Sequence, residues 1–263
     1  MTVVKGAFEK AKLYIESHSK EPIWTQQKKK QGPCITISRE TGAGAGCVGD
    51  ELVKFFQSFC EVGDIPWTAF DKNLIEKVME DHHLPQKLKQ YFIEDKLSEF
   101  KATINELLGI HPHAWMLVSK TASTIVQLAY KGNVVIIGRA ANIVTANLKN
   151  TFHVRLIGSF ENRVKHVQEI HNLNRNEAIE FTKNEDNAKQ DYFKKYYNKE
   201  IEDPLLYHMI INTDNISYEM TARIIGRAVI DNFPEMFVFK EENILNRLKQ
   251  TNIFPLQPNS NYY

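Results

Sequence analysis

The feature that most constrains the fold of this chain is a cluster of glycines directly after a short apolar segment. Residues 34–37, Cys-Ile-Thr-Ile, are mostly apolar and partly β-branched, which predicts a buried strand. Apolar residues recur at helical spacing from Leu52 to Phe59. Between these segments lie Gly42, Gly44, Gly46 and Gly49. Glycines let backbone N–H groups turn towards an anion, and a helix N-terminus attracts negative charge, so the sequence predicts a phosphate-binding loop.

Strand and helix patterns alternate along the rest of the chain. Short apolar runs predict strands at residues 134–137, 152–157 and 209–211. Helical patterns occupy residues 115–130, 159–170, 174–197 and 217–230. This alternation predicts an α/β fold: a parallel sheet with helices on both faces, in the three-layer arrangement of P-loop NTPases. Ligands of such sheets bind beyond the carboxyl ends of the strands.

We divide the chain into three parts. Residues 1–32 predict an N-terminal amphipathic helix and a linker, residues 33–231 the α/β domain, and residues 232–263 a C-terminal tail. Within the domain, the charged segment at about 71–112 has a helical pattern and no strand pattern, which predicts a helical insertion. The long charged helix at about 172–199 predicts a lid-like segment.

Composition limits the classes of function. The formal net charge of +1 and the absence of a nucleic-acid motif argue against nucleic-acid binding. No apolar run reaches the roughly 18–20 residues of a membrane span, and no secretory signal precedes the domain. Three cysteines without metal-type spacing suit a reducing compartment. We therefore expect a cytoplasmic protein without nucleic-acid or membrane partners.

The glycine-rich loop departs from the usual pattern G-x-x-x-x-G-K-[ST]. Ala45 stands where the lysine that contacts the donor phosphates is expected, and Cys47 where the hydroxyl residue that contacts magnesium is expected. Arg39 is the nearest cation, and its guanidinium can contact phosphate oxygens in bidentate fashion. In the alternative interpretation Arg39 pairs with Glu40 and has no catalytic role. The predicted phosphate-binding residues are Thr41, Gly42, Ala43, Gly44, Ala45, Gly46 and Cys47.

Other polar residues follow the later strands. Arg139 comes directly after Gly138 and a buried strand, at the edge where ligands bind, so we expect it to be functional. Asn142 either contacts the ligand together with Arg139 or has only a structural role in the loop. Cations on the predicted helices are explained equally well by ordinary solvated charge and by ligand contact. These cations are Arg163, Lys183 and Lys189.

Two further groups suggest other interpretations. The histidines have no cysteine or paired acidic ligand at a zinc spacing, so no metal site of protein ligands is predicted. The aromatic residues of the lid-like helix could stack on a base, but packing against the body is favoured. These residues are His82, His83, His111 and His113, and Tyr192, Phe193, Tyr196 and Tyr197.

The order and spacing of several motifs resemble the cytidylate kinase-like family. Residues 35–40, Ile-Thr-Ile-Ser-Arg-Glu, followed by the glycine-rich loop, are similar to the family's Ser-Arg-Glu-Tyr-Gly-Ser-Gly-Gly opening, which also lacks the lysine. The similarity covers residues 33–230. Its other motifs are FDKNLI at 70–75, VVIIGRAAN at 134–142, FHVRLIGSFENRV at 152–164, the lid segment at 186–197 and the ending at 203–217.

The resemblance implies a five-stranded parallel core, a monophosphate-binding insertion, a lid, and phosphoryl transfer from ATP with Mg²⁺. It also implies that Arg139 holds the acceptor phosphate, and that Asp186 and Lys189 face the acceptor or the transferred group. Position and resemblance together predict the catalytic residues Arg39, Arg139, Asp186 and Lys189, and the acceptor residues Asp71, Arg139, Asn142, Arg163 and Lys183. Departures from the family pattern are Lys189 for arginine, His208 for aspartate, and residues 45–47 for Gly-Arg-Glu.

The function predicted from these features is ATP-dependent phosphoryl transfer to a small acceptor, of the nucleoside monophosphate kinase type. Loss of the lysine and the hydroxyl leaves a second interpretation open, a nucleotide-binding regulatory protein without transfer activity. A third is a scaffold that forms a homodimer through the N-terminal helix and the C-terminal tail.

Overall fold

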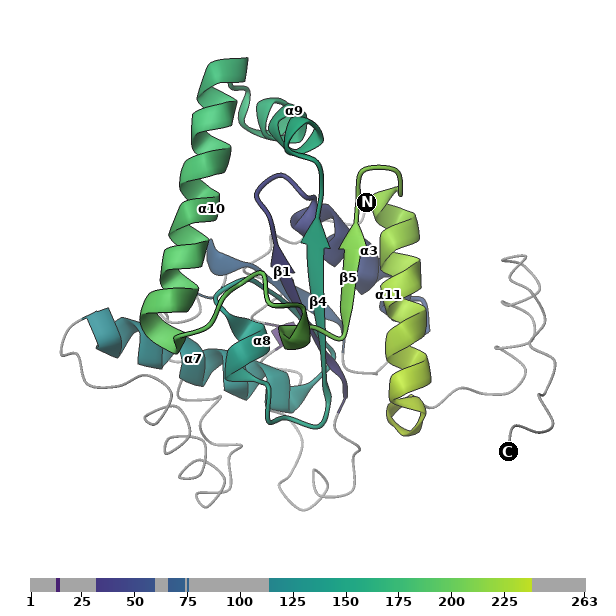
Figure 1. The fold of residues 1–263 in the computed structure, drawn as a ribbon. Coiled ribbons are helices and arrows are strands. Elements are labelled where there is room, and N and C mark those ends of the chain that lie inside the picture. Colours follow the sequence, from purple (N-terminus) through teal and green to yellow (C-terminus); the bar gives the residue numbers. More distant parts are fainter. Residues whose placement is uncertain (1–12, 15–31, 60–65, 74, 76–113, 238–263) are drawn as a thin grey trace, which may run out of the picture.

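A five-stranded parallel sheet forms the centre of the protein. The computed structural model describes residues 13–14, 32–59, 66–73, 75 and 114–237. The strand order is β2-β3-β1-β4-β5, and every pair of neighbours is parallel. The strands are β1 (Cys34–Arg39), β2 (Thr68–Phe70), β3 (Val134–Ile137), β4 (Thr151–Ile157) and β5 (Met209–Asn212). Because all strands run in one direction, their carboxyl ends meet at a single edge, at the top of Figure 1.

Helices cover both faces of the sheet (Figure 1). On one face, α3 and α11 bury Leu52 and Ile225 against Ile37. On the other face, α7 buries Leu128 against Cys34 and Ile136. Alternate residues of a strand therefore enter different cores, as the pleat requires. The helices are α3 (Ala45–Gln57), α7 (Ala114–Lys131), α8 (Ala141–Val144), α9 (Phe160–His171), α10 (Arg175–Tyr197) and α11 (Tyr218–Asn232), with 3₁₀ turns η1 (Pro204–Leu206) and η2 (Pro234–Met236).

The predicted α/β fold is confirmed, and the four strand segments recognised in the sequence lie within β1, β3, β4 and β5. The residues of β2 were not predicted as a strand, because three residues are too few to display an alternating pattern. The four-residue helix α8 was missed for a similar reason. Residues 76–112 of the predicted insertion and the predicted tail from 238 onward lie outside the described residues, so these divisions stay predictions.

The long helix α10 begins at a capping box. The Glu177 amide donates to Asn174 Oδ1 at 3.0 Å, and the Asn174 amide donates to Glu177 Oε2 at 2.9 Å. From this cap α10 runs down beside the sheet, so that its first half stands level with the carboxyl ends of the strands (Figure 1). Asp186 and Lys189, in the middle of α10, contact Thr41 of the glycine-rich loop.

Candidate active site

The glycine-rich loop needs glycine at two positions. Gly42 and Gly44 have φ of 85° and 79°, in the left-handed region. A Cβ on Gly42 would lie 2.3 Å from the Arg163 carbonyl oxygen, and one on Gly44 would lie 2.1 Å from the Tyr218 ring. Gly44 is also the N-cap of α3, and no side chain caps the helix there. The first-turn amides of α3, which begins at Ala45, are thus available to an anion at the positive end of the helix dipole.

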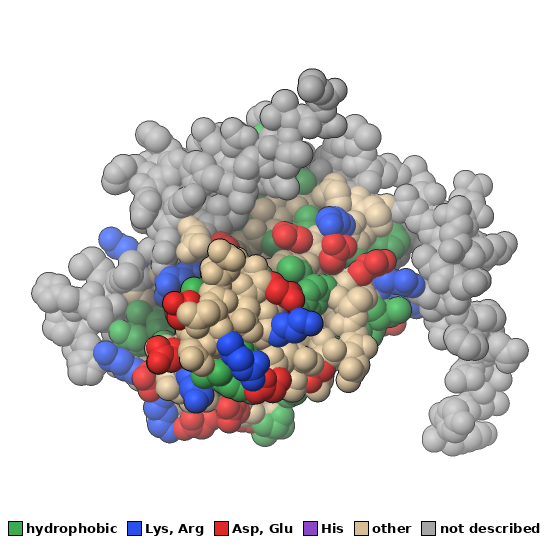
Figure 2. Space-filling model, turned by 90° about the horizontal axis from the view of Figure 1, so that it is seen from above, with side chains coloured by type: hydrophobic (Ala, Val, Ile, Leu, Met, Phe, Trp, Pro, Cys, Tyr) green, Lys and Arg blue, Asp and Glu red, His purple; other side chains and the backbone are tan. Residues whose placement is uncertain are grey.

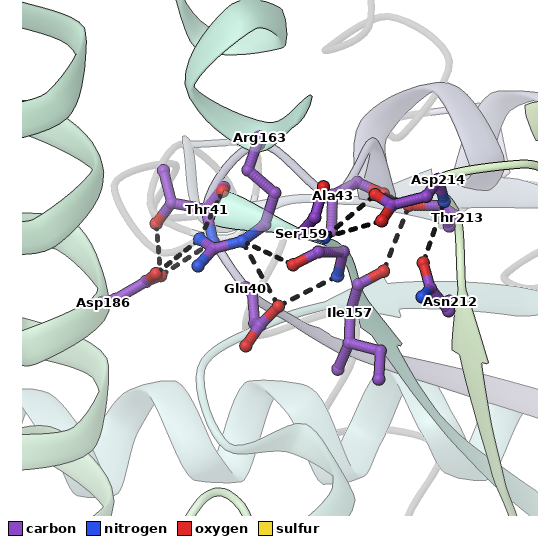
Figure 3. A network of polar contacts seen from close by, with 12 residues as sticks. Glu40, Thr41, Ala43, Ile157, Ser159, Arg163, Asp186, Asn212, Thr213 and Asp214 are labelled. Carbon is purple, nitrogen blue, oxygen red and sulfur yellow. Dashed lines mark hydrogen bonds and ion pairs between the residues drawn. The ribbon is translucent and has the colours of Figure 1, made fainter. Parts of the chain in front are cut away.

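An ion-pair network joins this loop to α9 and α10 (Figure 3). Arg163 on α9 pairs with Asp186 on α10 at 2.6 Å and with Glu40 at 3.3 Å, and its side chain is only 10% exposed. Lys189 pairs with Asp186 at 3.1 Å and contacts the Thr41 hydroxyl. We call Glu40, Thr41, Arg163, Asp186 and Lys189 the loop–lid network. Arg163 also donates to the carbonyl oxygens of Thr41 and Gly158.

Asp186 accepts more hydrogen bonds than any other member of the loop–lid network. The Thr41 amide and the Thr41 hydroxyl each donate to its Oδ1 at 2.7 Å. Burial acts to raise the pKa of Asp186, but the hydrogen bonds from Thr41, the charge of Lys189 and the hydrogen bond from Arg163 outweigh burial and lower it. The carboxyl group is therefore ionised at neutral pH.

A cavity of about 210 Å³ opens next to the loop. His166 on α9 forms a hydrogen bond through Nδ1 with the Gly42 carbonyl oxygen at 2.7 Å, and the Tyr218 hydroxyl lies 3.0 Å from the same nitrogen. Asp214, after β5, accepts from the Ser159 amide at 2.9 Å (Figure 3). Sequence reasoning missed His166 and Tyr218, which lie on helix faces without a recognisable motif. The cavity is lined by Gly42, Asn162, Arg163, Lys165, His166, Glu169, Thr213, Asp214 and Tyr218.

Arg39 lies at the carboxyl end of β1, pressed against the end of β3. A Cβ on Gly138 would lie 1.9 Å from Arg39 Nη1, so the guanidinium occupies the space that a side chain at 138 would need. Burial lowers the pKa of Arg39, an effect opposed by the charges of Glu185 and Asp71. Within the described residues the Arg39 guanidinium makes no hydrogen bond or ion pair. Glu40, the alternative partner considered for Arg39, pairs with Arg163 instead.

The segment after β3 has an unusual backbone. Gly138, Arg139 and Ala140 all have positive φ, at 83°, 54° and 51°. Consecutive left-handed residues other than glycine cost energy, and they concentrate at functional sites. Burial raises the pKa of Tyr197, and the charge of Arg139 opposes this shift, which places Arg139 close to the aromatic face of α10. Arg39, Arg139 and the loop therefore share one edge of the sheet.

The other predicted site residues are dispersed. Asn142 is buried and donates to the Leu206 carbonyl oxygen at 3.5 Å. Asp71 is exposed and lies within electrostatic reach of Arg39. Lys183 is exposed, with its ammonium 5.8 Å from the centre of the Phe160 ring. Arg163 was grouped with the acceptor residues, and in the structure it contacts the glycine-rich loop through the Thr41 carbonyl oxygen.

Sequence reasoning assigned no role to Arg155, whereas it predicted packing for the aromatic residues of α10 and singled out His208. Arg155 is 4% exposed and donates to Ser38 Oγ at 3.2 Å. An arginine inside an otherwise apolar strand is a sequence feature that could have revealed it. Phe193 and Tyr197 pack into the core cluster beside α7, as the packing interpretation predicts. His208, at a position where the family usually has aspartate, accepts from the His153 amide at 2.9 Å.

The part of the chain that the structure describes shows neither of two further features. There, no three His, Cys, Asp or Glu side chains are grouped to hold a metal ion. Likewise, none of its helices combines the length and the apolar character needed to cross a membrane. Among the described side chains visible from above, basic and acidic groups are intermixed, and they form no patch of one sign (Figure 2). The four histidines considered as metal ligands lie outside the described residues.

Comparisons with known proteins agree with this architecture. The chain is 30% identical over 105 residues to a cytidylate kinase from Staphylothermus marinus, a match that covers 40% of this chain and 58% of that protein. The crystal structure of an uncharacterized protein from Eubacterium ventriosum superimposes with a TM-score of 0.58 at 18% identity, over 77% of this chain and 99% of that one. The second likeness shows the fold alone.

The family match is broader than either of these. A family model described as the cytidylate kinase-like family matches residues 34–215, which include all five strands and the loop–lid network. The match covers more than half of the chain, and its residues are those whose motifs and fold are described above. The protein is therefore a member of the cytidylate kinase-like family.

Proposed function

We propose that this protein is an ATP-dependent phosphotransferase of the nucleoside monophosphate kinase type, which acts on a small phosphorylated acceptor. The position of Arg39 carries the proposal. Its guanidinium lies beside Gly138, within electrostatic reach of Asp186 and Lys189, and makes no hydrogen bond or ion pair within the described residues. A partly buried cation without a bound anion is costly, and a phosphoryl group at this position offsets that cost. Arg39 thus takes the role of the missing lysine.

The donor nucleotide binds across the loop and the neighbouring cavity. Its phosphates accept from the first-turn amides of α3, where Gly44 leaves the helix without a side-chain cap. Its base enters the cavity of about 210 Å³, where the ring of Tyr218 and the imidazole of His166 offer stacking surfaces. The amides and the cavity adjoin, because Gly42 belongs to both the loop and the cavity wall.

Magnesium arrives with the nucleotide in this proposal. The carboxylates beside the loop, Glu40 and Asp186, are ion-paired with Arg163. Cys47 supplies a thiol where a hydroxyl is usual, and Mg²⁺ prefers oxygen ligands. Mg²⁺ usually keeps several waters and binds through substrate phosphates, so the residues present fit an ion held mainly by the donor. The ion's role there is to neutralise charge on the phosphates.

The transfer requires position and positive charge more than covalent help from the protein. An acceptor phosphate oxygen attacks the γ-phosphorus, the bond to the β–γ bridging oxygen breaks, and ADP leaves with that electron pair. Arg39, Arg163 and Lys189 surround the loop and neutralise the charge that spreads over the transferred group. Arg139 holds the acceptor phosphate from the end of β3. Asp71 and Asn142 stand on the acceptor side.

Cytidine monophosphate is the first acceptor to test, because the matched relative carries the name cytidylate kinase. The assay measures ADP release from ATP and magnesium across nucleoside monophosphates and small phosphorylated metabolites. Acceptor-dependent release is expected from the wild type and is lost in Arg39→Ala. Arg227→Ala is a matched control, since Arg227 lies in an exposed ion pair with Asp231 on α11. Equal turnover in Arg39→Ala and Arg227→Ala would reject the assignment of Arg39.

A second candidate function follows from the loop itself. Ala45 and Cys47 remove two of the groups that normally serve transfer chemistry, so a nucleotide-binding regulatory protein is the alternative. The same assay separates the two functions. ATP that raises the melting temperature without any turnover across the acceptor panel would favour the regulatory protein. If there is no turnover and ATP does not change the melting temperature, nucleotide binding is rejected.

A further inference from the structure

The carboxylate of Asp186 is hydrogen-bonded to Thr41, the first residue of the predicted phosphate-binding loop. Its Oδ1 accepts from the Thr41 amide and the Thr41 hydroxyl, both at 2.7 Å, and lies 3.1 Å from Lys189 Nζ. Its Oδ2 lies 2.6 Å from Arg163. Figure 3 shows the side chain reaching from α10 to the loop and to the Arg163 guanidinium. Four donors from three segments of the chain therefore converge on one anion.

These donors are of the kinds that hold a phosphate. A backbone amide in a glycine-rich loop, a hydroxyl, a guanidinium and an ammonium group all donate to phosphate oxygens in nucleotide sites. Arg163 divides its charge between Asp186 and Glu40, and Lys189 is paired with Asp186. Two of the three cations near the loop are thus already neutralised by carboxylates. A donor phosphate gains their full charge only if Asp186 leaves.

Asp186 and Arg163 contact the loop independently of each other. Asp186 and Lys189 stand three residues apart, on the same face of α10, so both meet the loop together. Arg163, by contrast, keeps its bonds to Gly158, Thr41 and Glu40 from α9 without any help from α10. Withdrawal of the Asp186 carboxylate therefore frees the Thr41 amide and leaves Arg163 in place at the loop.

We propose that Asp186 is a latch: its carboxylate engages Thr41, Arg163 and Lys189, and the donor phosphates must displace it to contact these groups. The inference rests on the proposed function and adds a residue that regulates the affinity for the donor nucleotide. Donor binding and release of α10 from Thr41 become one coupled event, so the latch sets the donor affinity. An ionised carboxylate left beside the phosphates would repel them, which is why the two anions exclude each other.

The test compares Asp186→Asn with Glu180→Gln, an exposed carboxylate on the same helix, so that both variants lose one negative charge from α10. Calorimetry measures the affinity for ATP and for tripolyphosphate. Asp186→Asn is expected to bind both at least about 5-fold more tightly than the wild type, the lower end of usual coupling effects. Glu180→Gln is expected to stay within about 2-fold of the wild type. If Asp186→Asn folds poorly, Asp186→Ala is the substitute. It removes the carboxylate without introducing a side-chain amide, and it should also increase the affinity for both ligands.

A measurement without nucleotide accompanies the titration. Hydrogen exchange of the Thr41 amide, followed by NMR, is expected to accelerate in Asp186→Asn and not in Glu180→Gln. If the wild type binds and turns over ATP but Asp186→Asn binds ATP no more tightly, the latch is overturned and the proposed function stands. Failure of all proteins to bind ATP would overturn the proposed function. Tighter tripolyphosphate binding by Asp186→Asn would then still support the latch, and unchanged binding would overturn it as well.

Discussion

Replacement of Gly138 by alanine tests how Arg39 is held at the site. A Cβ at position 138 would lie 1.9 Å from Arg39 Nη1, so one of the two groups must move. Gly138 has φ of 83°, and alanine in the left-handed region costs about 1–2 kcal/mol. Because the colliding atom is the end of a flexible side chain, the guanidinium moves and the backbone stays. The free energy of unfolding should therefore fall by little more than the cost of the backbone strain.

Two readouts follow from this displacement. The melting temperature of Gly138→Ala should fall by about 2–8 °C, given roughly 2–4 °C per kcal/mol for a domain of this size. The turnover number should fall by about 100-fold, which is the usual effect of a shift of about 1 Å at a catalytic group. Thermal unfolding by circular dichroism and ADP release with ATP and CMP measure the two effects. Gly46→Ala is the control for stability, since no atom lies within 4 Å of the added Cβ.

A double variant separates the strain from the displacement. In the Arg39→Ala background the colliding guanidinium is gone, so adding Gly138→Ala should cost stability through backbone strain but should reduce turnover no further. The reasoning would be refuted by full turnover in Gly138→Ala. An additional loss of turnover in the double variant would also refute it, because Gly138 would then act through a group other than Arg39.

Three further predictions concern stability. Arg163→Ala should lower the free energy of unfolding by about 3 kcal/mol in urea denaturation, because it leaves Asp186 and Glu40 without their shared partner; a loss below about 1 kcal/mol would contradict the importance of the network. Burial lowers the pKa of His153 from 6.5 to about 4, so as the pH falls the unfolded chain is protonated before the folded chain. The free energy of unfolding should therefore be constant above about pH 6.5 and decrease by roughly 3 kcal/mol as the pH falls to 4. His153→Gln should lose this part of the pH dependence, and an unchanged urea-denaturation pH profile would refute it. Asn174→Ala should cost about 1 kcal/mol through the cap of α10, measured by the same method, and no loss would contradict the capping box.

The sheet could be predicted from the sequence wherever its strands are long enough to show a pattern. Residues 134–137 were predicted with the bounds that β3 has, since four apolar residues between Gly132 and Gly138 leave little alternative. Ser217 begins the helical segment predicted at residues 217–230, and in the structure it caps α11, with its hydroxyl accepting from the Met220 amide at 3.1 Å. Ser159 occupies the N-cap position of α9, but its side chain makes no capping hydrogen bond. In its place, Asp214 accepts from the Ser159 amide, a contact across 55 residues that no local pattern reveals.

The site was predicted in part. The glycine-rich loop and Arg39 follow from the order of strand, loop and helix, because each depends on neighbours in the sequence. The partners of Arg163 do not, since Glu40 and Asp186 come from β1's end and from α10. The close approach of Arg39 to Gly138 depends in turn on the pairing of β1 with β3. Such contacts require the packed sheet, and charge patterns along one helix cannot predict them.

The measurement that tests the central claim most directly is the separation of turnover from donor affinity in Arg39→Ala. Single-turnover transfer of the γ-phosphoryl group from ATP to CMP gives the first quantity, and calorimetry with ATP gives the second. If Arg39 replaces the missing lysine in the transition state, transfer falls by about 100- to 1,000-fold, while ATP affinity falls by less than about 10-fold. Transfer at the wild-type rate in Arg39→Ala would contradict the account.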